Sequence, residues 1–349
     1  MAASWLAPTG RPHPSPRVAV RSIACVADPS ASPASLSATT LDGSVKPVAS
    51  PPAPPPPPPV VVSAPPSSVP LAFTEAGASP LQTTTLPPVV ILHGLFGAGS
   101  NFGSWAKALS ESCKEAGAQR RIMLVDLRNH GDSMHASDMS FDALAADVVA
   151  LLDAQGIDRA VLFGHSIGGK VAMATALQHA ERVERLLVMD IAPITYDPAE
   201  EQWAAIEDVV RAMRAVELDA VASKRDADRQ LTTAGVGSAD LRAFVLTNLV
   251  RSIGASENAF RWRVNLDAIT THLGALGGWD VDGQYDGNTL FIAGGKSRFL
   301  RSSHLPAIEQ SFSRFSLQTI RTADHWIHAS EPDALLVIAS NFLAFTGRT

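Results

Sequence analysis

Ser166 stands in the stretch GHSIG, with Gly164 two residues before it and Gly168 two residues after it. An apolar run precedes this stretch and an apolar helical pattern follows it, so the serine lies at a sharp strand-to-helix turn. A residue at such a turn is forced into an unfavourable backbone conformation, and side chains two positions away on either side would collide. The pattern predicts a nucleophile elbow at Ser166. The alternative is a glycine-rich turn that serves packing only.

A serine hydroxyl is a poor nucleophile until a base takes its proton and a third group orients that base. Two histidines near the C-terminus, His325 and His328, are candidates for the base. We prefer His325 because it follows the strand-like run SLQTIRTA in a tight loop. His328 is expected to be a structural residue near the start of the last helix.

The carboxylate that orients this base is expected at an unusual place. In most proteins with this kind of strand order, the carboxylate follows the next-to-last strand. The sequence there reads LFIAGGKSRF and contains no acidic residue. Asp190 ends the preceding strand-like run, LLVMDIAP, on the same sheet edge as the elbow. We therefore assign the acid to Asp190. The alternatives are that Asp190 caps the entrance of the following segment, or that another acid reaches in from that segment.

Backbone amides must stabilise the oxyanion that forms when a nucleophile adds to a carbonyl. The stretch ILHGLFGAGSNF follows the first long buried strand, and its glycines let the chain bend over the site. The amide of Leu95, or alternatively that of Phe96, is expected to pair with the amide of Ile167. These three residues are the predicted oxyanion hole.

Strand and helix signals alternate from about Leu71 to the C-terminus. In SFDALAADVVALLDAQG the apolar residues share one helix face, Ser140 can cap the start and Gly156 can close the end. Such alternation indicates parallel strands with crossover helices, a doubly wound α/β sheet whose sites lie beyond the carboxyl ends of its strands. The predicted strands lie in PVVILHG, RIMLVDLRNHG, RAVLFGHS, RLLVMDIAP, NTLFIAGG and SLQTIRTA.

Nearly a hundred residues without a strand signal separate VMDIAP from NTLFIAGG. They contain helical segments such as AEEQWAAIEDVVRAMRAV and ADLRAFVLTNLVRSI. We interpret this segment, about residues 194–285, as a helical lid, with an ordinary surface elaboration as the alternative. Four of its apolar residues are candidates for an acyl pocket or for the core of the lid: Phe244, Leu249, Phe260 and Trp262.

Composition excludes several other classes of protein. The chain has 349 residues, a net charge of −6 and no cluster of Lys and Arg, which argues against nucleic acid and anionic lipid as partners. No apolar run is long enough to span a bilayer. Its two cysteines cannot build a disulfide framework, and no histidine pair has metal-ligand spacing, so neither a metal nor another cofactor is expected. Asp126, Arg128, His130 and His165 are expected to be structural.

The first 70 residues differ from the rest of the chain. Residues 1–40 are rich in Ala, Ser, Pro and Arg and have no acid before Asp28, and an unbroken proline run extends from Pro54 to Pro59. Acid-poor, Ser- and Arg-rich starts are typical of organelle transit peptides, and SIACVA resembles plastid processing sites. We expect a transit peptide and Pro-rich linker over 1–70 and one folded domain over 71–349. Chloroplast is the expected location, with mitochondrion or a disordered cytosolic tail as alternatives.

Residues 88–349 resemble the α/β-hydrolase superfamily, and within it the ABHD11-like esterases and their bacterial YbfF-type relatives. The matching stretches are HGLFG, DLRNHGDS, GHSIGGK, MDIAP, GGKSRF and HWIHASEPDA, with LTNLV and FRWRVNLDAI in the lid. The resemblance implies an α/β-hydrolase fold: a mostly parallel sheet flanked by helices, with a lid between its sixth and seventh strands. It further implies Ser166 as nucleophile, His325 as base and Asp190 as acid. Ile167 stands where the family usually has methionine.

The function expected from these residues is hydrolysis of small to medium acyl esters or thioesters through an acyl-enzyme, without a cofactor. Epoxide hydrolases and haloalkane dehalogenases are disfavoured because they carry a carboxylate at the position of Ser166. A cofactor-free haloperoxidase or C–C hydrolase is an alternative that uses the same three residues. A ligand receptor or adaptor with little turnover is a further alternative, because fold does not determine function.

Overall fold

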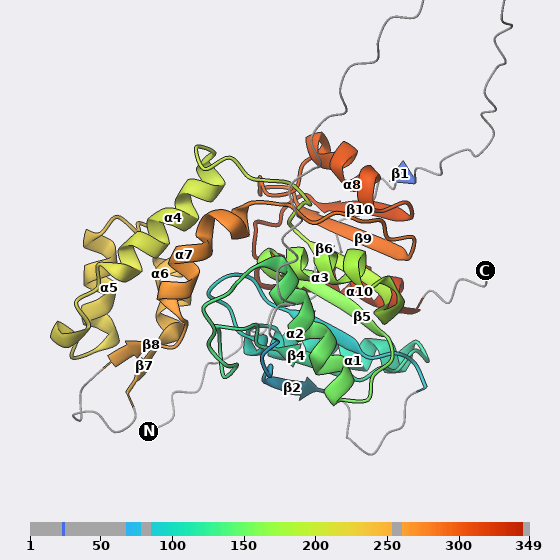
Figure 1. Ribbon diagram of the computed structural model, residues 1–349, viewed down its shortest axis with the longest axis horizontal. Coiled ribbons are helices and arrows are strands. Elements are labelled where there is room, and N and C mark those ends of the chain that lie inside the picture. The colour runs from blue at the N-terminus through green and yellow to red at the C-terminus, as the bar shows by residue number, and fades with distance from the viewer. Residues whose placement is uncertain (1–22, 25–67, 78–84, 253–259, 345–349) are drawn as a thin grey trace, which may run out of the picture.

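The computed structural model describes residues 23–24, 68–77, 85–252 and 260–344 (Figure 1). Most of the predicted transit peptide and linker, 1–22 and 25–67, lies outside the described residues. Within that predicted segment, residues 23 and 24 form a two-residue strand, β1 (Ile23–Ala24), that pairs antiparallel with the strand at 315–320.

One eight-stranded sheet organises the body of the protein, in the order β1-β10-β9-β6-β5-β3-β4-β2. All six strands predicted from apolar runs are present and mutually parallel. The antiparallel edge strand β2 was not predicted from the sequence. The strands are β2 (Phe73–Ala76), β3 (Val89–Leu92), β4 (Ile122–Val125), β5 (Ala160–His165), β6 (Val183–Met189), β9 (Asn288–Gly294) and β10 (Phe315–Ile320).

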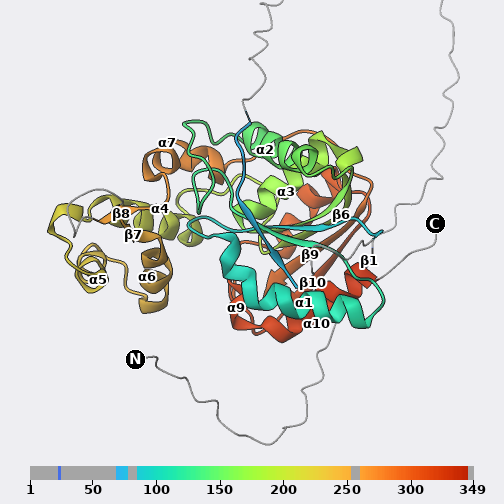
Figure 2. The same ribbon diagram turned by 90° about the horizontal axis from the view of Figure 1, so that it is seen from below.

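Helices cover both faces of the sheet (Figures 1 and 2). Strand β3 shows why: Val90 and Leu92 face the apolar cluster that includes α2 and α3, whereas Val89 and Ile91 face the cluster that includes α1 and α10. Alternate side chains of a strand point to opposite faces, so a sheet buried on both sides consists of continuous apolar runs. These helices are α1 (Gly103–Glu115), α2 (Phe141–Ala154), α3 (Ile167–Gln178), α8 (Leu305–Ser311), α9 (Ile327–Ser330) and α10 (Pro332–Ala344).

Helix α2 begins and ends as the sequence predicts. The Ser140 hydroxyl accepts a hydrogen bond from the Ala143 amide, and Gly156 follows the helix with a φ of +63°. Both features satisfy backbone groups that the helix ends leave unpaired.

A mainly helical insertion connects β6 to β9 and lies to one side of the sheet (Figures 1 and 2). It also contains a two-stranded hairpin, so the expectation of a segment without strands was wrong. The helix predicted over 239–253 ends at Val245, since the chain turns through η4 (Leu246–Asn248) into the hairpin. The insertion consists of α4 (Glu201–Arg214), α5 (Lys224–Thr233), α6 (Ala239–Val245), β7 (Leu249–Arg251), β8 (Phe260–Trp262) and α7 (Leu266–Gly277).

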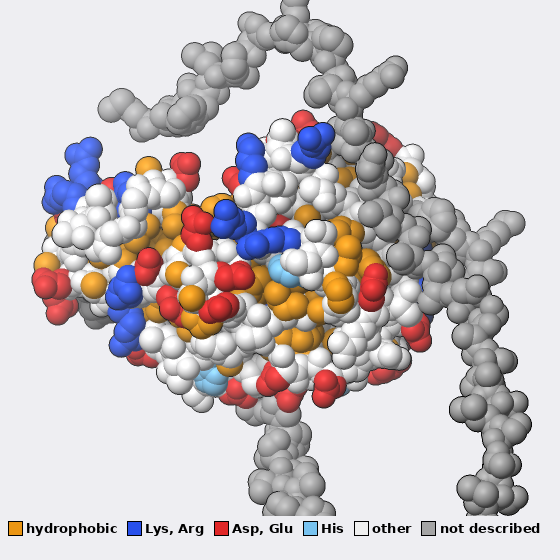
Figure 3. Space-filling view, turned by 90° about the horizontal axis from the view of Figure 1, so that it is seen from above, with side chains coloured by type: hydrophobic (Ala, Val, Ile, Leu, Met, Phe, Trp, Pro, Cys, Tyr) orange, Lys and Arg blue, Asp and Glu red, His pale blue; other side chains and the backbone are white. Residues whose placement is uncertain are grey.

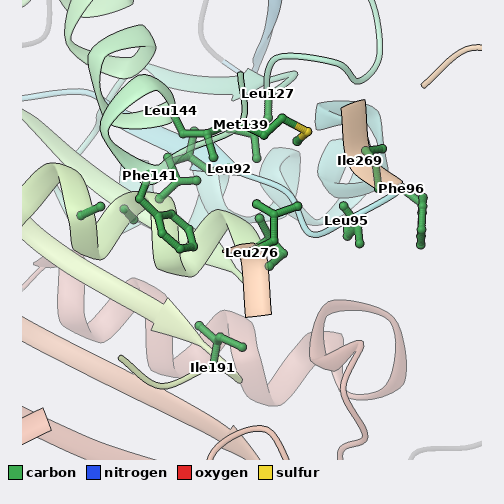
Figure 4. Close-up of a cluster of buried hydrophobic side chains, with 14 of the residues drawn as sticks. Leu92, Leu95, Phe96, Leu127, Met139, Phe141, Leu144, Ile191, Ile269 and Leu276 are labelled. Atoms are coloured by element: carbon green, nitrogen blue, oxygen red, sulfur yellow. The ribbon is translucent and has the colours of Figure 1, made fainter. Parts of the chain in front are cut away.

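The insertion shares a hydrophobic core with the body. Ile269 and Leu276 of α7 are fully buried in the same cluster as Phe141 and Leu144 of α2 and Leu92 of β3 (Figure 4). Burial of apolar surface stabilises a folded chain by about 25 cal/mol per Å². This shared core therefore holds α7 against the carboxyl edge of the sheet.

Lys170 of α3 fixes the two ends of the insertion to the body. Its fully buried ammonium donates hydrogen bonds to the carbonyl oxygens of Ile194 (2.9 Å), Gly277 (2.9 Å) and Gly278 (2.7 Å). The ring of Tyr196 lies 4.9 Å from the same nitrogen, which allows a cation–π contact. Lys170, four residues after Ser166, thus connects α3 to the segments through which the chain enters and leaves the insertion.

Candidate active site

The elbow around Ser166 has the steric character that the sequence predicts. Ser166 adopts a φ of +52°, a conformation that costs free energy for any residue with a side chain. A Cβ atom on Gly164 would lie 2.2 Å from the carbonyl oxygen of Gly168, and one on Gly168 would lie 2.4 Å from that of Leu92. Both positions therefore require glycine, and the turn projects the Ser166 hydroxyl beyond the carboxyl end of β5.

Ser166, His325 and Asp190 form one chain of hydrogen bonds. His325 Nε2 lies 3.1 Å from Ser166 Oγ, and His325 Nδ1 lies 2.8 Å from Asp190 Oδ2. Asp190 is fully buried, so its carboxylate has no competing contact with water. Nδ1 donates to the carboxylate, which leaves Nε2 free to accept the serine proton. This arrangement can turn a hydroxyl into a nucleophile.

Asp190 reaches His325 because its own backbone is bent sharply after β6. Its φ is +54°, and its amide donates to the carbonyl of Ile292 in the neighbouring strand at 2.8 Å. The amide of Gly294, at the end of β9, donates to Asp190 Oδ1 at 2.9 Å. Strand β9 thus contributes a backbone donor where most relatives of this fold are expected to place the acid itself.

The structure distinguishes the two candidates for the first oxyanion donor. The Phe96 amide is already donated to His130 Nε2 at 3.2 Å, so it is not free to bind an oxyanion. Among the described residues, no acceptor takes the amide hydrogen of Leu95 or of Ile167. Leu95 and Ile167 are therefore the pair that can serve as an oxyanion hole, and Phe96 is not part of it.

Two buried neutral histidines support the loop that carries Leu95. His93 lies between the Gly94 carbonyl (2.8 Å) and the Leu127 amide (3.0 Å), so its ring both donates and accepts. His130 lies 5.1 Å from it, between ring centroids. Burial lowers the pKa of His93 to about 4 and that of His130 to about 3. Both are uncharged near neutral pH, which agrees with the structural role expected for His130.

The lowered pKa of His93 predicts how stability depends on pH. Between pH 6.5, the ordinary pKa of histidine, and pH 4, the unfolded chain binds one proton here that the native chain does not. The unfolding free energy should therefore fall as pH falls, by about 1.4 kcal/mol per pH unit from this residue. Denaturant unfolding at several pH values measures the slope, and His93→Gln should flatten it. An unchanged slope in that variant would contradict neutral burial of His93.

An apolar cavity of about 250 Å³ opens over Ser166 and His325. Of the four pocket residues predicted from the sequence, Phe244 lies on its wall. Leu249 and Trp262 instead pair across the hairpin, and Phe260 ends it, so none of these three lines the cavity. The sequence analysis did not assign other wall residues to the pocket, because they are apolar helix or loop positions and the sequence does not show which of these face a cavity. These include Ile206, Val209, Leu241, Phe299 and Trp326.

His165 and His328 lie beside the triad but do not belong to it. His165 Nε2 lies 2.9 Å from the carbonyl oxygen of His325, and so holds the loop that carries His325. His328 stacks on Phe102, with ring centroids 4.3 Å apart, and lines the cavity. Burial lowers the pKa of His328 to about 4, so it is uncharged near neutral pH.

Arg128 and Asp126 serve the loops behind the elbow through separate partners. The Arg128 guanidinium pairs with Asp147 at 2.6 Å, both side chains being buried. Asp126 accepts the backbone amides of Gly99 (2.7 Å) and Asp132 (2.8 Å). These contacts are structural rather than catalytic.

Within the described residues, other kinds of functional site are not evident. No group of three or more His, Cys, Asp and Glu side chains there could hold a metal ion. None of the described helices is both long and apolar enough to cross a membrane. On the face shown in Figure 3, acidic and basic side chains are interspersed with hydrophobic ones.

Comparison with known proteins agrees with the fold. The sequence profile of the α/β hydrolase fold family matches residues 87–332, and the chain belongs to this family. The sn-1-specific diacylglycerol lipase ABHD11 of Mus musculus is 40% identical over 265 residues, which cover 74% of this chain and 82% of that protein. Esterase YbfF of Escherichia coli is 33% identical over 258 residues, covering 73% of this chain and 92% of that protein.

A solved structure of a marine microorganism esterase has the same fold. It superimposes with a TM-score of 0.70 and 29% identity, covering 78% of this chain and 99% of that one. The family resemblance noted from the sequence motifs is thus confirmed.

Proposed function

We propose that this protein is a serine-dependent carboxylic-ester hydrolase that acts on small to medium acyl esters, with Ser166, His325 and Asp190 as its catalytic residues. The observation that carries the proposal is the hydrogen-bonded chain of these residues at an apolar cavity, beside the amides of Leu95 and Ile167, which no acceptor takes in the described part of the chain. The esterase and lipase names of the relatives support the same activity.

The geometry gives each residue a step in the reaction. His325 Nε2 removes the proton of Ser166 Oγ, which attacks the acyl carbonyl carbon. The amides of Leu95 and Ile167 stabilise the resulting oxyanion. As the intermediate collapses, His325 gives the proton to the leaving alcohol, and Ser166 remains acylated. Water then repeats the attack and releases the acid. None of these steps needs a cofactor.

Hydrolysis of p-nitrophenyl esters from acetyl to lauroyl tests this proposal directly. We expect multiple turnovers with one preferred chain length, and one phosphonyl group per chain on the Ser166 peptide after treatment with a fluorophosphonate. A folded protein that neither turns over any of these esters nor becomes labelled would refute the proposal.

Space for the substrate extends beyond the acyl cavity. A second cavity of about 770 Å³ shares Asn101, Phe244, Trp326 and His328 with the first, and continues along α1 toward Asp333. We infer that one cavity receives the acyl chain and that the other receives the rest of the ester.

Phe244 lies between the two cavities, so Phe244→Ala should join them. We expect the preferred p-nitrophenyl ester to become longer, with the ratio of lauroyl to acetyl kcat/KM rising at least several-fold. A matched control is Phe260→Ala, because Phe260 lies in the hairpin away from the cavity. An unchanged chain-length profile in Phe244→Ala, or an equal shift in Phe260→Ala, would argue against this role.

We further propose that residues 1–70 direct the chain to the chloroplast, with mitochondrion as the alternative. The support is compositional: residues 1–40 are rich in Ser, Pro and Arg and have no acid before Asp28. Fusion of residues 1–70 to a fluorescent protein tests this. Diffuse cytosolic fluorescence would refute it.

A further inference from the structure

The turn that carries the oxyanion donor Leu95 contains a strained residue. The Gly97 amide donates to the Gly94 carbonyl at 2.9 Å and closes a four-residue turn. Phe96, the third residue of this turn, has a φ of +61°. Glycine or asparagine is favoured at such a position, since a larger side chain there costs free energy. Something must therefore hold Phe96 in place.

Two buried side chains hold the backbone of Phe96 from opposite sides. His130 Nε2 accepts its amide hydrogen at 3.2 Å, and Asn248 Nδ2 donates to its carbonyl oxygen at 2.8 Å. His130 is 1% exposed and Asn248 is 4% exposed. Buried hydrogen bonds of this kind are costly to break, because the freed groups cannot turn to water.

Both of these contacts depend on the insertion. Asn248 is part of it, and the Arg263 amide at the end of the hairpin donates to the Asn248 carbonyl at 2.7 Å. Asn265, the N-cap of α7, donates from its amide to the Asn129 carbonyl (2.9 Å) and from its side chain to Asn129 Oδ1 (3.0 Å). Asn129 is the residue before His130. The insertion therefore supports the oxyanion turn directly and through the loop that carries His130.

We propose that Asn248 is a positioning residue for catalysis: from the insertion, it holds the Phe96 carbonyl and thereby keeps the Leu95 amide aimed at the oxyanion. This inference rests on the proposed ester hydrolysis. Without the Asn248 donor, Phe96 can relax from its strained φ, and the amide of the preceding residue, Leu95, turns away from the site. The ester would still bind, because the cavity wall and the triad are intact, but its transition state would be less stabilised.

The test compares the full-length wild type with Asn248→Leu and Asn248→Asp, which keep the size of the side chain and lose the donor. Thr247→Val is the matched control, because Thr247 is exposed in the same turn and its hydroxyl bonds only within its own segment. Kinetics use p-nitrophenyl esters. Titration with a fluorophosphonate counts the competent sites. Binding of an alkyl trifluoromethyl ketone reports the oxyanion hole, because the serine adds to the ketone carbonyl and the resulting hemiketal carries an oxyanion.

We expect kcat/KM per titrated site to fall roughly 10- to 100-fold in both variants, less than the loss of a whole oxyanion donor. The fall should appear in kcat with little change in KM, and affinity for the ketone should fall by the same factor. Thr247→Val should resemble the wild type.

Three outcomes would overturn the inference. The first is wild-type kcat/KM in both variants. The second is a loss of activity that merely follows the number of titrated sites, which would make Asn248 structural only. The third is a lower kcat with unchanged affinity for the ketone. A wild type without esterase activity would refute the proposed function and this inference together, whereas the other outcomes leave the proposed function standing.

Discussion

Ser166→Ala is expected to reduce ester hydrolysis by at least about a thousandfold, since removal of the serine from a triad of this kind can cost about a millionfold in kcat. The hydroxyl is the only group that the hydrogen-bond geometry places within proton-transfer distance of His325 Nε2, at 3.1 Å, among the described residues. Without it no acyl-enzyme forms. The fold should persist, because the Ser166 side chain makes no other hydrogen bond there and alanine keeps its Cβ.

The measurement is the steady-state rate with p-nitrophenyl esters, with fluorophosphonate labelling on the same preparations. Ser137→Ala is the control, because Ser137 is an exposed serine that lines neither of the two cavities. It should keep wild-type turnover. Residual activity above a few per cent in a folded Ser166→Ala variant would mean that another nucleophile does the chemistry.

The elbow could be predicted from the sequence because its cause is local. The two glycines lie four residues apart, one near the end of β5 and one in the first turn of α3, and the structure shows the collisions that other residues would cause at Gly164 and Gly168. Five of the predicted strands, β3, β4, β5, β6 and β9, are correct for a similar reason: they are buried on both faces and are therefore nearly continuous apolar runs, whereas β10 is only half-buried.

The positions of Asp190 and His325 followed from order along the chain. Each comes after a strand of the parallel sheet, and the carboxyl ends of such strands meet at one edge. The sequence does not predict the sharp bend at Asp190, with its φ of +54°. Nor does it predict that the Gly294 amide donates a hydrogen bond to the Asp190 carboxylate. Those features depend on the pairing of β6 with β9, more than a hundred residues apart.

The acyl pocket was predicted poorly because its walls have no pattern of their own. Leu249, Phe260 and Trp262 are large apolar residues, yet they build the β7–β8 hairpin, which lies in a segment where the sequence analysis expected no strand. The choice between Leu95 and Phe96 likewise needed a long-range fact, the His130 acceptor for the Phe96 amide. Contacts between distant segments decide these points.

Asp190→Asn should lower kcat by roughly four orders of magnitude, as the equivalent change does in a serine protease with a Ser-His-Asp triad. The carboxylate only accepts hydrogen bonds, so it selects the His325 tautomer whose proton lies on Nδ1. An asparagine amide facing Nδ1 would donate instead and would select the tautomer whose proton lies on Nε2. That tautomer cannot take the proton of Ser166.

The structure also indicates that this variant should fold. The side-chain oxygen of asparagine can still accept the Gly294 amide, which lies 2.9 Å from Asp190 Oδ1. Asp197→Asn is the matched control, because Asp197 lies seven residues after Asp190 but is exposed, accepts the Ala199 amide and lines neither cavity. Rates with p-nitrophenyl esters and thermal unfolding of both variants decide the matter. Near-normal turnover in Asp190→Asn, or an equal loss in Asp197→Asn, would remove Asp190 from the triad and reopen the search for the group that orients His325.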